Sequence, residues 1–119
     1  MKAILLVSHG SRSPKTKEEI VVLVDALRQR LTGVIAAYAF LEIESPNIPE
    51  GIDQCVSKGA HEIVVTLNFL NSGRHVNDDI PAIVLAAQKK YPQVKFCISQ
   101  PIGQHPQIPN LFIDLINNA

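Results

Sequence analysis

The sequence has few of the residues on which several common functions depend. Aromatic residues make up 5% of the chain and tryptophan is absent, which argues against a stacking platform for single-stranded nucleic acid. The two cysteines, Cys55 and Cys97, lie far apart and outside any metal-ligand spacing. We therefore expect two buried thiols in a reducing cytosol.

Net charge and long apolar runs are also lacking. Eleven basic and eleven acidic residues give a formal net charge of zero, so no overall field recruits nucleic acid or an anionic membrane. No apolar run approaches the roughly 18 residues of a membrane span, and the first residues indicate a strand rather than a signal peptide. We predict no nucleic-acid or membrane partner, and any anion must bind locally.

What the chain does contain is an alternation of apolar strand-like and amphipathic helix-like segments. The predicted strands cover residues 3–7, 34–40, 62–67 and 94–98, and the predicted helices run from 14 or 15 to 31, 49–58, 76–90 and 108–116. Continuous apolar strands are typical of parallel sheets buried on both faces. The order predicts an α/β fold, a four-stranded parallel sheet with helices on both faces. With 119 residues, we expect residues 1–119 to form a single domain.

Two histidines follow strands of this predicted sheet. His9 comes directly after the first strand and before Gly10, and His75 lies between the loop after the third strand and the third helix. Open α/β sheets bind ligands at the carboxyl ends of their strands. Neutral imidazole is a common ligand for first-row divalent metals and titrates near neutral pH. We predict a metal or acid–base site at this edge, with hydrogen-bonded loop histidines as the alternative.

Polar residues surround these histidines in the sequence. Glu42 follows the second strand and is a candidate third ligand or proton acceptor. Arg12 and Arg74 are suited to bidentate binding of a carboxylate or phosphate, which indicates an anionic ligand. Ser11 and Ser72 are candidates for hydrogen bonds to the same ligand.

Several other signatures are excluded. Gly10 and Gly73 belong to no G-x-G-x-x-G or Walker A pattern, and neither Ser11 nor Ser72 lies in a nucleophile elbow. A phosphohistidine phosphatase or mutase is expected to place arginine before the His-Gly pair, where Ser8 stands. His105 follows the fourth strand on the same edge and is a weaker candidate for contact with a ligand.

Three segments together carry a resemblance to a known family. They are residues 6–12 (LVSHGSR), residues 39–42 (AFLE) with Pro46, and residues 69–81 (FLNSGRHVNDDIP). Their order and spacing resemble those of the short CbiX-type sirohydrochlorin chelatases, which are class II tetrapyrrole chelatases. The resemblance runs from residue 3 to about residue 106.

The resemblance implies insertion of a divalent metal into sirohydrochlorin without ATP, in the cytoplasm. The metal is Co²⁺ in cobalamin synthesis or Fe²⁺ in sirohaem synthesis, and Ni²⁺ is also compatible with imidazole ligands. No further cofactor is implied. Short members are similar to half of longer two-domain forms, so the resemblance implies a homodimer. It places the metal on His9 and His75, and the family's acidic residue after the second strand on Glu42; all three are candidate catalytic residues, with a histidine or Glu42 as the proton acceptor.

The macrocycle carries many carboxylates and an apolar face, and both need a binding surface. Arginines suit the carboxylates, and apolar side chains at the edge of the sheet suit an open cleft. The predicted substrate-binding residues are Ser11, Arg12, Phe40, Phe69, Leu70, Ser72, Gly73 and Arg74.

Two other functions stay open. A non-catalytic protein that carries or senses a metal or tetrapyrrole would use the same histidines, but a carrier needs no proton acceptor such as Glu42. A flavodoxin-like or receiver-like signalling domain would bind flavin, or would carry an acidic phosphoacceptor at the end of the first strand, where His9 stands.

Overall fold

The computed structural model describes residues 1–119, with the exception of the side chain of His75. The strands are β1 (Lys2–Ser8), β2 (Val34–Phe40), β3 (Glu62–Leu67) and β4 (Lys95–Ile98). The helices are α1 (Pro14–Arg30), α2 (Ile48–Ser57), α3 (Ile80–Lys90) and α4 (Ile108–Asn117), with a short π-helix η1 (His75–Asp79) and a 3₁₀-helix η2 (Ile102–Gln104). All strand pairs are parallel, in the order β2-β1-β3-β4. The predicted four-stranded parallel α/β fold is confirmed.

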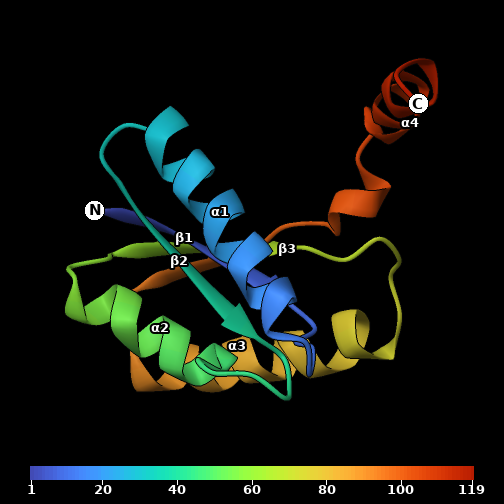
Figure 1. The fold of residues 1–119 in the computed structure, drawn as a ribbon. Coiled ribbons are helices and arrows are strands. Elements are labelled where there is room, and N and C mark those ends of the chain that lie inside the picture. The colour runs from blue at the N-terminus through green and yellow to red at the C-terminus, as the bar shows by residue number, and fades with distance from the viewer.

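Helices cover the sheet on both sides (Figure 1), α1 on one face and α2 and α3 on the other. The central strand β1 is buried toward both layers. Leu5 is fully buried in the core formed with α2 and α3, whereas Leu6 is 5% exposed in the cluster formed with α1. Burial of each such side chain contributes about 1.5–3 kcal/mol, so the apolar run of the first strand fixes it at the centre of the sheet.

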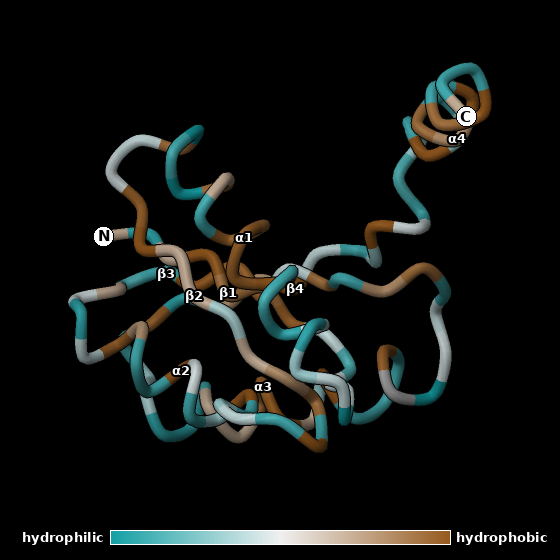
Figure 2. The backbone as a smooth tube through the Cα atoms, viewed as in Figure 1, coloured by the Kyte–Doolittle hydropathy of each residue, from teal (hydrophilic) through white to brown (hydrophobic). Residues whose placement is uncertain are grey.

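The last helix does not cover the sheet as predicted. No residue of α4 is buried, and the helix stands away from the rest of the molecule (Figures 1 and 2). The chain between β4 and α4 is held against the loop after β3, where the backbone N–H of Gly103 donates to the carbonyl of Phe69 at 3.0 Å. From this anchor the chain leaves the body of the protein.

The start of the third helical segment also differs from the prediction. One α-helix over 76–90 was expected, but a π-helix at His75–Asp79 precedes α3. Pro81 has no N–H to donate to the carbonyl of Asn77, so the α-helical pattern is interrupted there. Wide turns of this kind occur often at functional sites.

Both cysteines are free, as expected, but they differ in burial. Cys55 is fully buried, and this burial raises the pKa of its thiol to about 11. Cys97 on β4 is half-buried, so the prediction that both thiols are buried is right for Cys55 alone. Among the described residues, the helices are all too short or too polar to cross a membrane.

Candidate functional site

The carboxyl ends of β1, β2 and β3 meet at one edge of the sheet. Ser8 is paired with Phe40, and Val7 is paired with Leu67. Backbone hydrogen bonds extend this pairing into the loops, from Leu41 N to Ser8 O at 2.8 Å and from Asn68 N to Val7 O at 2.9 Å. The sequence prediction that these loops share one edge is therefore confirmed.

His9 is exposed at this edge and rests on a core side chain. Its ring meets the ring of Phe69 edge-on, with centroids 4.6 Å apart and 84° between the planes. Its backbone carbonyl accepts a hydrogen bond from Glu42 N at 3.1 Å. The histidine is thus tied to the loops of both neighbouring strands.

Gly10 allows the first and second loops to approach this closely. Its φ is +98°, and a Cβ at this position would lie 1.9 Å from the carbonyl oxygen of Glu42. A positive φ favours glycine, and a clash of this size with backbone excludes any other residue without a shift of the loop. Gly10 therefore sets the distance between His9 and the loop that carries Glu42.

The loop after β2 is strained next to Glu42. Ile43 has a φ of +74°, and Glu44 N donates to the Glu42 carbonyl at 2.8 Å, which closes a γ-turn. A β-branched residue in this region is an outlier that costs about 1–3 kcal/mol and is found mostly at functional sites. Sequence reasoning missed Ile43, because nothing in the residue type predicts a positive φ.

Glu42 and Glu44 have different surroundings. The Glu44 carboxylate accepts a hydrogen bond from Ser11 N at 2.7 Å and is half-buried. Glu42 is exposed at the edge, where a bound ligand can reach it. The structure therefore gives Glu44 a role in holding the loop after β1 and leaves the Glu42 side chain at the surface.

A capping box ends the same loop at the start of α2. The Asn47 side chain accepts from Glu50 N, and the Glu50 side chain accepts from Asn47 N, both at 2.9 Å. The spacing of an N-cap residue and a glutamate three positions later is a known sequence pattern, so this anchor could have been predicted.

The predicted apolar cleft is only partly supported. Phe40 is 0% exposed and packs under α1, and Phe69 is 4% exposed beneath His9. The prediction that these two rings line a cleft is wrong, because both fill the core instead. Leu70 is 63% exposed and is the one predicted apolar contact that lies at the surface.

The polar residues predicted to bind substrate lie at the surface near this edge. Arg12, Ser72, Gly73 and Arg74 are exposed, and Ser11 is half-buried, with its hydroxyl accepting from Ser13 N at 3.1 Å. The predicted metal-site side chain of His75 lies outside the part of the chain that the structure describes. Among the described side chains, no group of three or more histidine, cysteine or acidic residues is placed to hold a metal.

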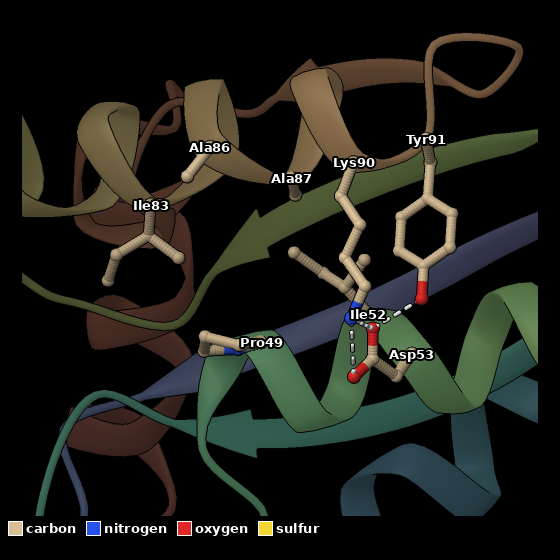
Figure 3. Close-up of a pocket in the computed structure, with 8 residues that line it drawn as sticks. All are labelled: Pro49, Ile52, Asp53, Ile83, Ala86, Ala87, Lys90 and Tyr91. Atoms are coloured by element: carbon tan, nitrogen blue, oxygen red, sulfur yellow. Dashed lines mark hydrogen bonds and ion pairs between the residues drawn. The ribbon is translucent and has the colours of Figure 1, made fainter.

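One pocket lies beside this edge of the sheet, and a second lies between two helices. One, of about 310 Å³, is lined by Thr66, Leu67, Ser99, Gln100, Pro101, Ile102 and His105. This places His105 in a pocket at the carboxyl ends of β3 and β4. The other, of about 220 Å³, lies between α2 and α3 (Figure 3) and contains none of the predicted site residues.

A small ionic cluster lines part of the pocket between α2 and α3 (Figure 3). The hydroxyl of Tyr91 donates to the Asp53 carboxylate at 2.5 Å, and the Lys90 ammonium donates to it at 3.2 Å. The Tyr91 hydrogen bond, with a smaller contribution from Lys90, lowers the pKa of Asp53. The cluster links the end of α3 to the middle of α2.

The parallel sheet with helices on both faces and a histidine at its carboxyl edge defines an α/β domain with a candidate ligand site at the ends of its strands. The family model described as CbiX matches residues 3–119. The chain therefore belongs to the CbiX family, as the sequence motifs predicted, and the match extends through α4.

The chain is similar to proteins with named activities. It is 37% identical to a sirohydrochlorin cobaltochelatase of Priestia megaterium, over 90% of this chain and 35% of that protein. It is 31% identical to a sirohydrochlorin ferrochelatase of the same organism, over 100% of this chain and 45% of that protein. The crystal structure of the sirohydrochlorin chelatase SirB from Bacillus subtilis subspecies spizizenii, in complex with cobalt, superposes with a TM-score of 0.87 and 28% identity, over 98% of this chain and 50% of that chain.

The lengths of these relatives differ from that of the chain. The chain spans about a third to a half of the length of the two Priestia proteins. A sirohydrochlorin cobaltochelatase of Methanosarcina acetivorans, 28% identical, is matched over 98% of this chain and 95% of that protein. A chain of this length is thus found among the named relatives.

Proposed function

We propose that the protein is a sirohydrochlorin chelatase, which inserts a divalent metal, Co²⁺ or Fe²⁺, into the free-base macrocycle. The observation that carries the proposal is His9, held by Phe69 and Glu42 at the carboxyl edge of a CbiX-family sheet. Relatives named as cobaltochelatase and as ferrochelatase support both metals equally. Ni²⁺ is a further candidate, because imidazole ligands do not discriminate among these ions.

In this proposal His9 and His75 hold the incoming metal ion, which is a substrate rather than a resident cofactor. As the ion enters the macrocycle, two pyrrole N–H groups lose their protons and the four nitrogens bind the metal. The protons pass to a general base at the edge, and the exposed carboxylate of Glu42 or a histidine serves as that base. No ATP and no further cofactor take part.

The exposed polar residues of the loops bind the carboxylates of the macrocycle. Arg12 and Arg74 provide guanidinium groups for bidentate pairing. Ser11, Ser72 and Gly73 provide further polar contacts, and the exposed Leu70 provides an apolar one. These groups come from the loops after β1 and β3, so the macrocycle spans the edge between those two strands.

We further propose that the active form is a homodimer and that it acts in the cytoplasm. The proposal is supported by the SirB comparison, in which this chain superposes on 50% of that chain. Two unpaired cysteines fit a reducing compartment. No membrane or nucleic acid takes part in the proposed reaction.

Multiple-turnover metallation separates the enzyme from a carrier. Under anaerobic conditions, sirohydrochlorin and Co²⁺ or Fe²⁺ in large excess over protein are followed by the absorbance of the metallated product. A chelatase forms many products per chain, faster than the reaction without protein. A carrier binds one equivalent of metal or sirohydrochlorin, and the remaining sirohydrochlorin is metallated no faster than without protein. That outcome would replace the proposed enzyme with a metal- or tetrapyrrole-binding protein.

A further inference from the structure

Ser8 is a buried polar residue directly beside the candidate site. Among the residues that the structure describes, it is the one polar side chain that is buried, at 7% exposed. It ends β1 and immediately precedes His9. Its hydroxyl accepts a hydrogen bond from Nδ2 of Asn68 at 3.1 Å. Because a buried hydroxyl without a partner is destabilising, Asn68 supplies a donor that this position needs.

The register of the sheet brings these two side chains together. Val7 is paired with Leu67, so Ser8 and Asn68 are the next residues in register. Asn68 N donates to Val7 O at 2.9 Å, which continues the pairing of β1 and β3 beyond the end of β3. The carbonyl of Ser8, by contrast, accepts from Leu41 N at 2.8 Å on the side of β2. Ser8 thus bonds toward β2 with its carbonyl and toward β3 with its side chain.

The hydrogen bond lies one residue before the contact of His9 with the core. Ser8 precedes His9 in the chain, and Asn68 precedes Phe69. The rings of His9 and Phe69 meet edge-on with centroids 4.6 Å apart. The hydrogen bond and the ring contact therefore join the same two segments at consecutive positions. Loss of the hydrogen bond frees the end of β1 to move relative to Phe69, and the imidazole moves with it.

The loop after β3 is held independently on its other side. Leu67 N donates to the hydroxyl of Ser99 at 3.0 Å, and Gly103 N donates to Phe69 O at 3.0 Å. Both bonds connect β3 and its loop to β4 and the segment after it. The side chain of Asn68 instead connects this loop to β1. Removing that side chain is therefore expected to loosen the position of His9 while β3 and β4 stay joined.

The position of His9 relative to this loop matters for a metal ion. The segment that starts at Asn68 leads to His75, the first residue of η1. A metal site needs its ligands within about 0.5 Å of the productive geometry, and residues outside the ligand set hold them there. A hydrogen bond between the residue before one histidine and the start of the loop that carries the other is placed to do this.

We propose that Asn68 is a positioning residue for the metal ion, because its hydrogen bond to Ser8 holds His9 in place against the loop after β3. This proposal rests on the proposed function, in which His9 and His75 hold the divalent ion. Asn68 acts through Ser8 and His9 and is not itself a ligand. We expect it to affect capture of the ion and to leave the binding of sirohydrochlorin unchanged.

The proton NMR signals of the His9 ring test the positioning directly, without metal. The ring current of Phe69 displaces these signals in the wild type, and His9→Ala assigns them among the four histidines. Asn68→Leu keeps a branched side chain and removes the donor, and it is expected to move the signals toward those of an unstructured histidine. The matched control is Thr66→Val, on the same face of β3, whose hydroxyl bonds to Val64 O at 3.2 Å. It is expected to leave the signals in place, and unmoved signals in Asn68→Leu overturn the proposal.

Co²⁺ titration without tetrapyrrole tests the consequence for the metal. Asn68→Leu and Ser8→Ala, both folded by circular dichroism, are each expected to weaken Co²⁺ binding about three- to tenfold, the size of one neutral hydrogen bond. The double variant is expected to bind no more weakly than either single variant, because both remove the same hydrogen bond. Thr66→Val is expected to match the wild type. Wild-type affinity in Asn68→Leu, or additive losses in the double variant, overturns the proposal.

The insertion assay separates this proposal from the proposed reaction. If Co²⁺ binding weakens as expected but the wild type does not accelerate metallation, the chelatase reaction is wrong and the role of Asn68 stands. If the wild type is an active chelatase and Asn68→Leu has an unchanged KM for Co²⁺, the role of Asn68 is wrong and the reaction stands. A raised KM for Co²⁺ with an unchanged KM for sirohydrochlorin supports both.

Discussion

The ring of His9 stands edge-on against the ring of Phe69, with centroids 4.6 Å apart. Phe69 is 4% exposed, so a core side chain orients an exposed histidine. Aromatic contacts of this geometry contribute about 0.5–1.5 kcal/mol, which is enough to favour one orientation of the imidazole. The candidate site is therefore partly preorganised by the hydrophobic core.

Phe69→Leu is expected to weaken metal binding more than it weakens the fold. Leucine keeps most of the buried volume, at a cost of about 1 kcal/mol, but it removes the edge contact to His9. The control Phe96→Leu changes a half-buried ring that packs on the α2–α3 core. Co²⁺ titration and thermal unfolding compare the two. Equal metal affinity in both variants, at equal stability, would remove Phe69 as a positioning residue.

Gly10→Ala is expected to be far more damaging than Gly59→Ala. Both glycines have a φ near +100°, namely +98° and +99°, so both substitutions carry the same backbone strain of about 1–2 kcal/mol. A Cβ at Gly59 meets nothing within 4 Å, whereas at Gly10 it meets the Glu42 carbonyl. Urea unfolding measures the extra loss, and the insertion assay should show activity retained only in Gly59→Ala. Similar losses of stability in both would mean that the loops are not closely packed.

Ile43→Gly is expected to stabilise the fold by about 1 kcal/mol. Glycine relieves the strain of φ +74°, worth roughly 1–3 kcal/mol, against a loss of about 0.5–1 kcal/mol in chain entropy. Ile43 is 62% exposed, so little buried area is lost. Ile43→Ala trims the side chain but keeps the strain, and it should show no such gain. With Glu42 as the proton acceptor, the looser turn in Ile43→Gly is expected to lower the rate of metal insertion. An unchanged insertion rate would mean that the reaction does not depend on the exact position of Glu42.

Asp53→Asn is expected to lower stability at pH 7 and to have no effect in strong acid. The Tyr91 hydrogen bond lowers the folded-state pKa of Asp53 below its unfolded value of about 3.9. Its stabilisation is therefore present above about pH 4 and is lost as the pH falls through the folded pKa. The Asp53 side chain is 46% exposed, so the effect stays under about 1 kcal/mol. Urea midpoints across this range measure it, and a difference that does not depend on pH would rule out the charge as its cause.

Much of the fold and the position of the site follow from local patterns. The alternation of apolar strands with amphipathic helices predicted the parallel sheet, and the position of His9 after the first strand predicted its binding edge, because both are read from local side-chain periodicity. The exposure of individual side chains could not be predicted from these local patterns. Phe40 and Phe69 were predicted at the surface and lie in the core, since the facing of Phe40 at the end of β2 and of Phe69 in the loop after β3 depends on which distant segments cover them.

Backbone features that depend on distant segments were also missed. Gly10 was noted as part of a motif, but its contact with Glu42 depends on the pairing of two loops. The departure of α4 from the sheet depends on the anchor between Gly103 and Phe69, which are far apart in the sequence. The positive φ of Ile43 opposes its own residue preference, so no propensity rule predicts it.

The most direct test of the account is the initial rate of anaerobic metallation of sirohydrochlorin by wild type, His9→Ala and His75→Ala, each with Co²⁺ and with Fe²⁺. The account predicts that wild type exceeds the rate without protein by orders of magnitude. It also predicts that each alanine variant, folded by circular dichroism, falls at least tenfold, because an acid–base or metal-holding group typically contributes 10²–10⁴-fold. A wild-type rate equal to the uncatalysed one, or full activity in both variants, would contradict it.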